Sequence, residues 1–160
     1  MKSEDGAPDQ TRIVVDADVL AADVLVGDAP RVVLDTVRAH SWLDLIATDP
    51  LLSDAESVIE ECATRRLATE WREAIGPLVT SVEQPAADHP ALAAAYRGGA
   101  AHLVSLDDRL RSPAAGAELR GAMDVSVRSP AAFVAVFDPA VAYESAFETE
   151  YAGPDRDPRA

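Results

Sequence analysis

Residues 13–25, with the sequence IVVDADVLAADVL, decide the fold class of this chain. The first three are apolar, β-branched and consecutive, as in a strand that is buried on both faces of a sheet. Asp16 and Asp18 follow at once, and from Val19 onward the apolar residues recur at helical spacing. The stretch therefore predicts a buried strand, an acidic turn and a helix, which is how an α/β fold begins.

The rest of the chain alternates between the same two patterns. Further strands are predicted at 43–48, 78–82, 102–106 and 125–127, and helices at 30–40, 50–75, 91–96, 114–121 and 131–137. Because the strands are continuous apolar runs, the alternation predicts a three-layer α/β/α sandwich with a central, mostly parallel sheet.

The predicted helix 50–75 is the longest element. Asp49 supplies its N-cap, and Gly76 followed by proline ends it. Its apolar residues form one stripe, which includes Cys62, the only cysteine of the chain. A lone cysteine excludes a disulfide framework and a thiolate zinc cage, and we expect Cys62 in the core.

The length of 160 residues fits one domain with short tails. We expect the domain at 12–138, after a disordered polar leader at 1–11 and before an extended tail at 139–160 that ends GPDRDPRA. The chain has no run of about 20 apolar residues, so no membrane partner is expected. The polar N-terminus lacks the apolar core of a signal peptide, which together with the single cysteine indicates a cytoplasmic protein.

The charge of the chain is strongly negative. It has 28 Asp and Glu against 14 Lys and Arg, a formal net charge of −14, and Lys2 is the only lysine. The 48% of hydrophobic residues excludes a disordered acidic chain. The acid excess instead indicates a halophilic protein in molar salt, where the Debye length falls to about 3 Å and self-repulsion is screened. The alternative is an acidic protein that works at ordinary salt concentrations.

Acidic residues occupy positions where parallel sheets bind their ligands, beyond the carboxyl ends of the strands. They are Asp16 and Asp18 after the first strand, Asp107 and Asp108 after the strand 102–106, and Asp88 at the start of the preceding helix. In the long helix, Glu56 borders the apolar stripe and is a better inward candidate than Glu60.

Carboxylates brought together at one sheet edge repel one another, and a divalent cation is an ordinary way to relieve this. Oxygen ligands select Mg²⁺ or Mn²⁺, whose open water positions phosphate oxygens can fill. The acids therefore indicate phosphodiester hydrolysis, in which the ion activates water and stabilises charge on the phosphoryl oxygens. With 28 acids, chance also places some at strand ends, and Asp88 and Asp108 can equally be cap and turn residues.

Three blocks of the sequence resemble the PIN-domain family. IVVDADVLAADVL (13–25) is similar to the family's opening strand, loop and helix, and DHPALAAAYRGGAAHLVSLDDRL (88–110) to its Asp-capped helix, Gly-Ala turn and strand ending in the final acid. VSVRSPAAFVAVF (125–137) is similar to its closing strand and the Pro, small residue and Phe that follow. The acidic, lysine-poor composition and the end GPDRDPRA resemble a PIN-like group of halophilic archaea.

The resemblance implies a metal-dependent ribonuclease. Carried over by position, the metal ligands and catalytic acids would be Asp16, Glu56 (or Glu60), Asp88 and Asp107, with Asp18 supporting Asp16. One position departs from the family: many members have a further Asp in the turn before the strand 102–106, where this chain has Ala101. That departure favours the alternative, a weakly active or inactive PIN-like module that binds RNA or protein.

RNA is expected to bind weakly and transiently. Molar salt removes the gain from counterion release, so metal-bridged phosphate and local arginines must supply the contacts. Arg109 and Arg111 are the candidates, because guanidinium forks bind phosphate bidentately. The PIN family also includes toxins of toxin–antitoxin pairs, so a toxin held by an antitoxin, another protein partner and a homodimer stay open.

Overall fold

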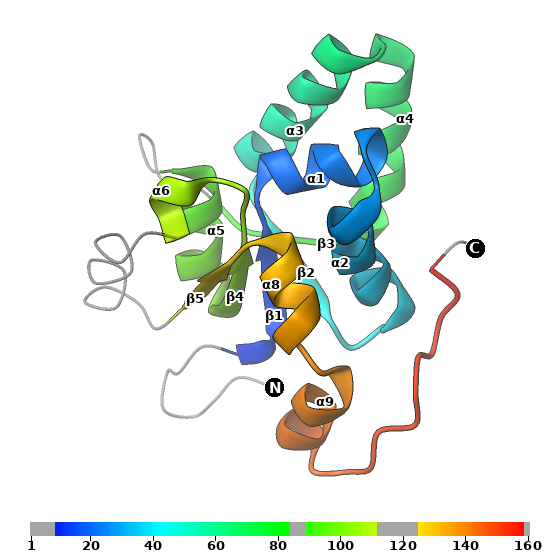
Figure 1. Ribbon diagram of the computed structural model, residues 1–160, viewed down its shortest axis with the longest axis vertical. Helices are drawn as coiled ribbons and strands as arrows, with labels where there is room; N and C mark the ends of the chain where they lie inside the picture. Colours follow the sequence, from blue (N-terminus) through cyan, green and yellow to red (C-terminus); the bar gives the residue numbers. More distant parts are fainter. Residues whose placement is uncertain (1–8, 84–88, 112–124, 159–160) are drawn as a thin grey trace.

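The computed structural model describes residues 9–83, 89–111 and 125–158, and within them it has a five-stranded parallel sheet between layers of helices (Figure 1). The strands are β1 (Asp9–Val15), β2 (Asp44–Ala47), β3 (Val79–Ser81), β4 (Ala100–Val104) and β5 (Ser126–Arg128). The helices are α1 (Ala17–Leu25), α2 (Asp28–Ala39), α3 (Asp49–Cys62), α4 (Arg65–Ile75), the 3-10 turn η1 (Gly76–Leu78), α5 (Pro90–Gly98), α6 (Asp108–Arg111), α8 (Pro130–Val136) and α9 (Pro139–Phe147). The predicted three-layer α/β/α sandwich is confirmed.

The strands lie in the order β3-β2-β1-β4-β5, and each neighbouring pair is parallel. In the central strand β1, Val14 lies opposite Ile46 of β2 on one side and Leu103 of β4 on the other. All three side chains are fully buried, as the continuous apolar runs predict. The sheet thus forms the middle of the core, with β1 as its central strand between β2 and β4.

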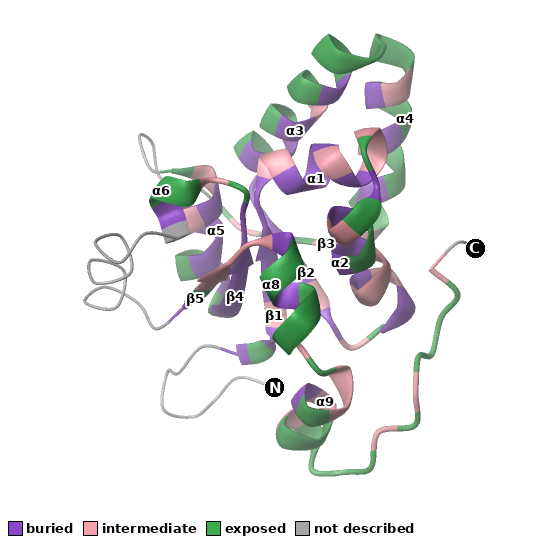
Figure 2. Cartoon of the chain, viewed as in Figure 1, coloured by how far each residue is buried: buried purple, intermediate pink, exposed green. Residues whose placement is uncertain are grey.

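Helices cover both faces of the sheet. α2 and α8 pack against each other on one face, whereas α5 packs on β1, β2 and β4 from the other (Figure 1). The approach of α5 is close: a Cβ on Gly98 would lie 2.4 Å from Cγ2 of Ile46. Gly99 then ends the helix in the left-handed conformation, at φ 62°. Buried residues accordingly concentrate in the strands and on the inner sides of the helices (Figure 2).

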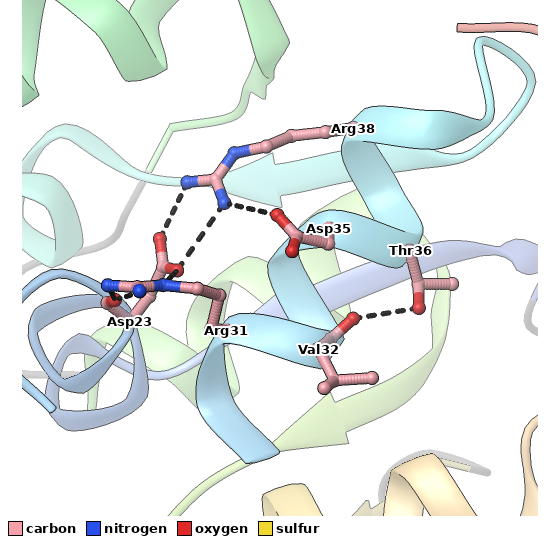
Figure 3. Close-up of polar contacts among 6 residues, drawn as sticks. All are labelled: Asp23, Arg31, Val32, Asp35, Thr36 and Arg38. Atoms are coloured by element: carbon pink, nitrogen blue, oxygen red, sulfur yellow. Dashed lines mark hydrogen bonds and ion pairs between the residues drawn. The ribbon is translucent and has the colours of Figure 1, made fainter. Parts of the chain in front are cut away.

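A buried carboxylate ties α1 to α2. Asp23 is 3% exposed, and its Oδ2 lies 2.6 Å from Nη2 of Arg38. Arg31 donates to the backbone carbonyl of Asp23 at 2.8 Å, and Asp35 also pairs with Arg38, at 3.1 Å (Figure 3). Gly27, at φ 90°, allows the turn between the two helices. These charge-assisted hydrogen bonds stabilise the charge that burial of Asp23 would otherwise penalise.

The prediction of one helix over 50–75 is wrong, because the segment forms the helical hairpin α3–α4. Ala63 leaves the helical region, and the hydroxyl of Thr64 accepts a hydrogen bond from the amide of Leu67 at 3.0 Å, which caps α4. The expectation that Cys62 lies in the core is also wrong. It is exposed, because it is the last residue of α3, and the tip of the hairpin projects beyond the sheet (Figures 1 and 2).

Regular secondary structure is found on both sides of 12–138. Residues 9–11, expected in the leader, belong to β1, while residues 1–8 lie outside the described part. The extended tail expected from residue 139 begins instead with helix α9, which Asp138 caps through the amide of Ala140 at 2.9 Å. The predicted helix 114–121 lies outside the described residues.

After α9 the chain returns to the end of α2. The hydroxyl of Tyr151 lies 2.6 Å from Nε2 of His40, and the amides of Asp155 and Arg156 both donate to the carbonyl of Ala39. Trp42 meets Tyr151 edge-on, with ring centroids 6.4 Å apart. The C-terminal segment is therefore packed on the domain.

Candidate functional site at the carboxyl ends of β1 and β4

The order of the strands reverses between β1 and β4. The chain adds β2 and β3 on one side of β1, and β4 and β5 on the other. Open α/β sheets bind ligands beyond the carboxyl ends of the strands at such a reversal. Asp16 is the first residue after β1 and Ser105 the first after β4, so both stand at this point.

Asp16 is held rigidly between the two strands. Its amide donates to the carbonyl of Val104 at 2.9 Å, and its Oδ1 accepts from the amide of Ala17 at 2.8 Å as the N-cap of α1. Its Oδ2 accepts from the hydroxyl of Ser105 at 2.7 Å. Asp16 is only 7% exposed, and the hydrogen bonds from Ala17 and Ser105 fix the direction of its carboxylate.

Ser105 is a site residue that sequence reasoning did not assign. It is fully buried, and its Oγ also accepts from the amide of Asp107 at 3.0 Å, so it connects Asp16 with the turn after β4. The available signal was its place: a small polar residue directly after β4, as Asp16 is directly after β1.

Asp18, in the first turn of α1, interacts electrostatically with Asp16 and Asp107. Burial raises the pKa of its carboxyl, and the charges of Asp16 and Asp107 raise that pKa further. Its Oδ1 lies 3.5 Å from the amide of Leu106 in the turn after β4. Three of the expected site residues therefore lie within electrostatic reach of one another.

Asp107 is bound by the guanidinium of Arg109. Nε and Nη2 of Arg109 lie 3.1 and 3.0 Å from Oδ1 and Oδ2 of Asp107, and the Arg109 amide donates to Oδ1 at 2.9 Å. These hydrogen bonds hold the pKa of Asp107 below its usual value. Arg109, expected to bind phosphate, thus pairs with the site acid, although its side chain is 89% exposed.

Two further expected residues lie in α6, next to Asp107. Asp108 is its exposed first residue, and Arg111 is its last, with a side chain outside the described part. Ala101, expected in the turn before β4, is instead the second residue of the strand and is 3% exposed.

Asp88 lies outside the described residues, but the next residue reaches the site. The Nδ1 of His89 accepts from the amide of Ala91 at 3.2 Å and caps α5. His89 is also close enough to Asp107 to act on it electrostatically, so the N-terminus of α5 lies near the turn after β4.

Glu56 and Glu60 have arginine partners on the helical hairpin. Glu56 Oε1 lies 3.9 Å from Arg72 Nη1, and Glu60 Oε1 lies 3.5 Å from Arg65 Nε. Arg72 also binds Asp49, which was expected to cap α3. The cap is instead Thr48, whose hydroxyl accepts from the amide of Leu51 at 3.2 Å.

A groove of about 390 Å³ leads away from the carboxylates between α1 and α3. Asp16 and Asp18 stand at its acidic end, and its walls are apolar, with Leu25 and Val58 among them. Within 9–83, 89–111 and 125–158, no three Asp, Glu, His or Cys side chains come close enough to hold one metal ion.

Comparison with known proteins places the sequence in a family but not in a functional class. A family model described as "Family of unknown function (DUF7384)" matches residues 7–159. No curated protein and no solved structure matches the chain. No helix in the described part is both long and apolar enough to cross a membrane.

Proposed function

The chain belongs to DUF7384, a family of unknown function, and from the residues at the carboxyl ends of β1 and β4 we propose that it is a metal-dependent ribonuclease of the PIN-like type. It would hydrolyse RNA phosphodiester bonds at Asp16, Asp18 and Asp107, in the cytoplasm of a halophile. Asp88 and Glu56 complete the set that the resemblance implies.

One observation carries the proposal: Asp16, Asp18 and Asp107 lie within electrostatic reach of one another where the strand order reverses. The pKa of Asp18 is raised by burial and by the charges of Asp16 and Asp107. Keeping all three carboxylates ionised therefore costs free energy. Sites where stability is given up in this way are frequently functional.

The acids present fit a hard divalent cation. Mg²⁺ is bound by one or two carboxylates and keeps several waters, so the lack of a three-acid group among the described residues does not conflict with it. Asp16 and Asp18 are the residues that would hold the ion. When bound, it would supply positive charge for the phosphoryl oxygens and make water a better nucleophile.

The remaining groups have roles that need no change of fold. Ser105 and the amide of Ala17 orient Asp16, so its carboxylate need not reorganise during the reaction. Asp18, whose pKa is raised by burial and by the charges of Asp16 and Asp107, would be stabilised as a carboxylate by the cation that it helps to hold. Arg109 is exposed and can exchange Asp107 for an incoming phosphate.

The test is an RNA cleavage assay with Mn²⁺ in molar KCl. We expect Asp16→Asn and Asp18→Asn each to lower the cleavage rate by about 100-fold or more, the usual size of an acid–base contribution. Asp54→Asn is the matched control, because Asp54 is an exposed aspartate on α3 outside the site. Mn²⁺ should also raise the melting temperature of the parent more than that of Asp18→Asn. Equal rates in parent and site variants would overturn the proposal.

A second function is favoured by the Asp107–Arg109 pair. If that pair stays closed, the fold is a catalytically silent PIN-like module that binds RNA or protein. In that case no RNA is cleaved, and RNA binding, measured by fluorescence anisotropy, falls in Arg109→Gln but not in Asp16→Asn.

A further inference from the structure

A second cavity, of about 450 Å³, lies apart from the aspartate site. It is lined by residues of β1, β4 and β5 and by the segment from the end of α8 through α9, and it shares no lining residue with the groove at Asp16. Its volume is in the range of small-molecule sites. Val136 and Val141 line it while remaining 58% and 66% exposed, so apolar surface is left uncovered around it.

A buried histidine without hydrogen bonds lies in the wall of this cavity. His102 is 9% exposed, and neither of its ring nitrogens has a hydrogen-bond partner within the described residues. The ring stands edge-on to Phe133 and Phe137, with centroids 5.7 and 5.4 Å away. Burial and the nearby charge of Arg128 lower its pKa to about 4, so it is a neutral imidazole at pH 7. Buried polar atoms of this kind ordinarily have a partner.

Arg128 is the cation of the cavity. It is half-buried, and among the described residues no ion pair or hydrogen bond of its side chain is found, whereas Arg38 and Arg72 each bind acids. In a chain with 28 acids against 14 bases, a half-buried arginine without an acid is unusual. A guanidinium presents a planar fork that matches a carboxylate.

The other charged residue of the wall limits the charge of a ligand. Asp138 lines the cavity, and its Oδ1 accepts from the amide of Ala140 at 2.9 Å as the cap of α9. One positive and one negative group make the site unsuitable for a polyanion such as a phosphate ester. The apolar side chains favour a ligand whose body is hydrocarbon.

We propose that this cavity binds a small monocarboxylate with an apolar body. The carboxylate would pair with Arg128, the neutral ring of His102 would form part of the wall beside it, and the hydrocarbon would cover Val136 and Val141. The site is separate from the proposed nuclease centre and does not depend on its activity.

The test is isothermal titration of the full chain with hexanoate and benzoate at pH 7, together with NMR of the His102 ring. We expect saturable binding of at least one of them, at least tenfold weaker binding of the neutral analogue hexanamide, and no binding of inorganic phosphate. Arg128→Gln should weaken carboxylate binding at least tenfold. Arg97→Gln, at an exposed arginine of α5 outside the cavity, should not change it.

Val141→Asp provides a second variant in case Arg128→Gln does not fold. Val141 is exposed at the cavity, so its replacement spares the core, and the added negative charge should repel a carboxylate. Absence of saturable binding of both acids, equal affinity for hexanamide, or unchanged affinity in the folded Arg128 and Val141 variants would each overturn the proposal.

Discussion

At the scale of single residues, His102 makes stability depend on pH. Its pKa is about 4 in the folded protein, through burial and then the charge of Arg128, against 6.5 in the unfolded chain. Between these values the unfolded state takes up a proton that the folded state does not. His102 therefore does not reduce stability above pH 6.5. As the pH falls from 6.5 toward 4, we expect it to lower the free energy of unfolding by about 3 kcal/mol.

Urea unfolding of the parent and of His102→Phe between pH 7 and 4 checks this expectation. Phenylalanine removes the titrating group and suits a wall that already contains Phe133 and Phe137. Carboxylates titrate in both proteins, so the difference between the two curves isolates His102. The difference in free energy of unfolding between the parent and His102→Phe should shrink or reverse toward pH 4, in buffers without carboxylates. Parallel curves for the two proteins would contradict a pKa of about 4 for His102.

The sequence predicts site residues best where backbone position alone decides. Asp16 and Asp107 could be placed because each follows a buried strand, and the carboxyl ends of neighbouring parallel strands share one edge. The partner of a long side chain depends on tertiary neighbours instead. Arg109 therefore binds Asp107, and Glu56 lies beside Arg72 of the next helix, which no spacing rule could show.

At the scale of elements, the break between α3 and α4 was missed because the apolar period runs on past it. Helical periodicity identifies an apolar stripe, but it does not reveal a change in the direction of the helix axis within that stripe. The available signal was Thr64, a good N-cap residue that precedes a second amphipathic segment. Similarly, Asp138 and Pro139 repeat the cap-and-proline pattern that correctly predicted α8 from Ser129 and Pro130.

Two threonine substitutions separate capping from helix propensity. Thr64→Ala removes the hydrogen bond to Leu67 and should lower the free energy of unfolding by about 1 kcal/mol. Thr36 is a half-buried residue within α2 whose hydroxyl donates an exposed hydrogen bond to the carbonyl of Val32 (Figure 3), so Thr36→Ala should be neutral or slightly stabilising. Urea unfolding measures both. An equal loss in the two variants would show that Thr64 does not act as a cap.

At the scale of the whole molecule, the fold class follows from alternation alone. Strands that are apolar at every position must be buried on both faces, and only helices on both sides of a parallel sheet achieve this. The order β3-β2-β1-β4-β5 does not follow, because the same alternation is compatible with other winding orders. The start of β1 at Asp9 and the packing of Tyr151 on Trp42 do not follow either, since a polar composition says nothing about strand pairing or side-chain packing.

The net charge of −14 predicts that salt stabilises this protein. Self-repulsion acts over about 10 Å in 0.1 M salt and about 3 Å in 1 M, so KCl should favour the compact state. We expect the melting temperature to rise by about 5 °C or more between 0.1 and 2 M KCl at pH 7. At the isoelectric point near pH 4.4 the mean charge vanishes, so the same salt series should have little effect. An equal rise at both pH values would assign the stabilisation to general salt effects on hydration and remove the physical basis for a halophilic origin.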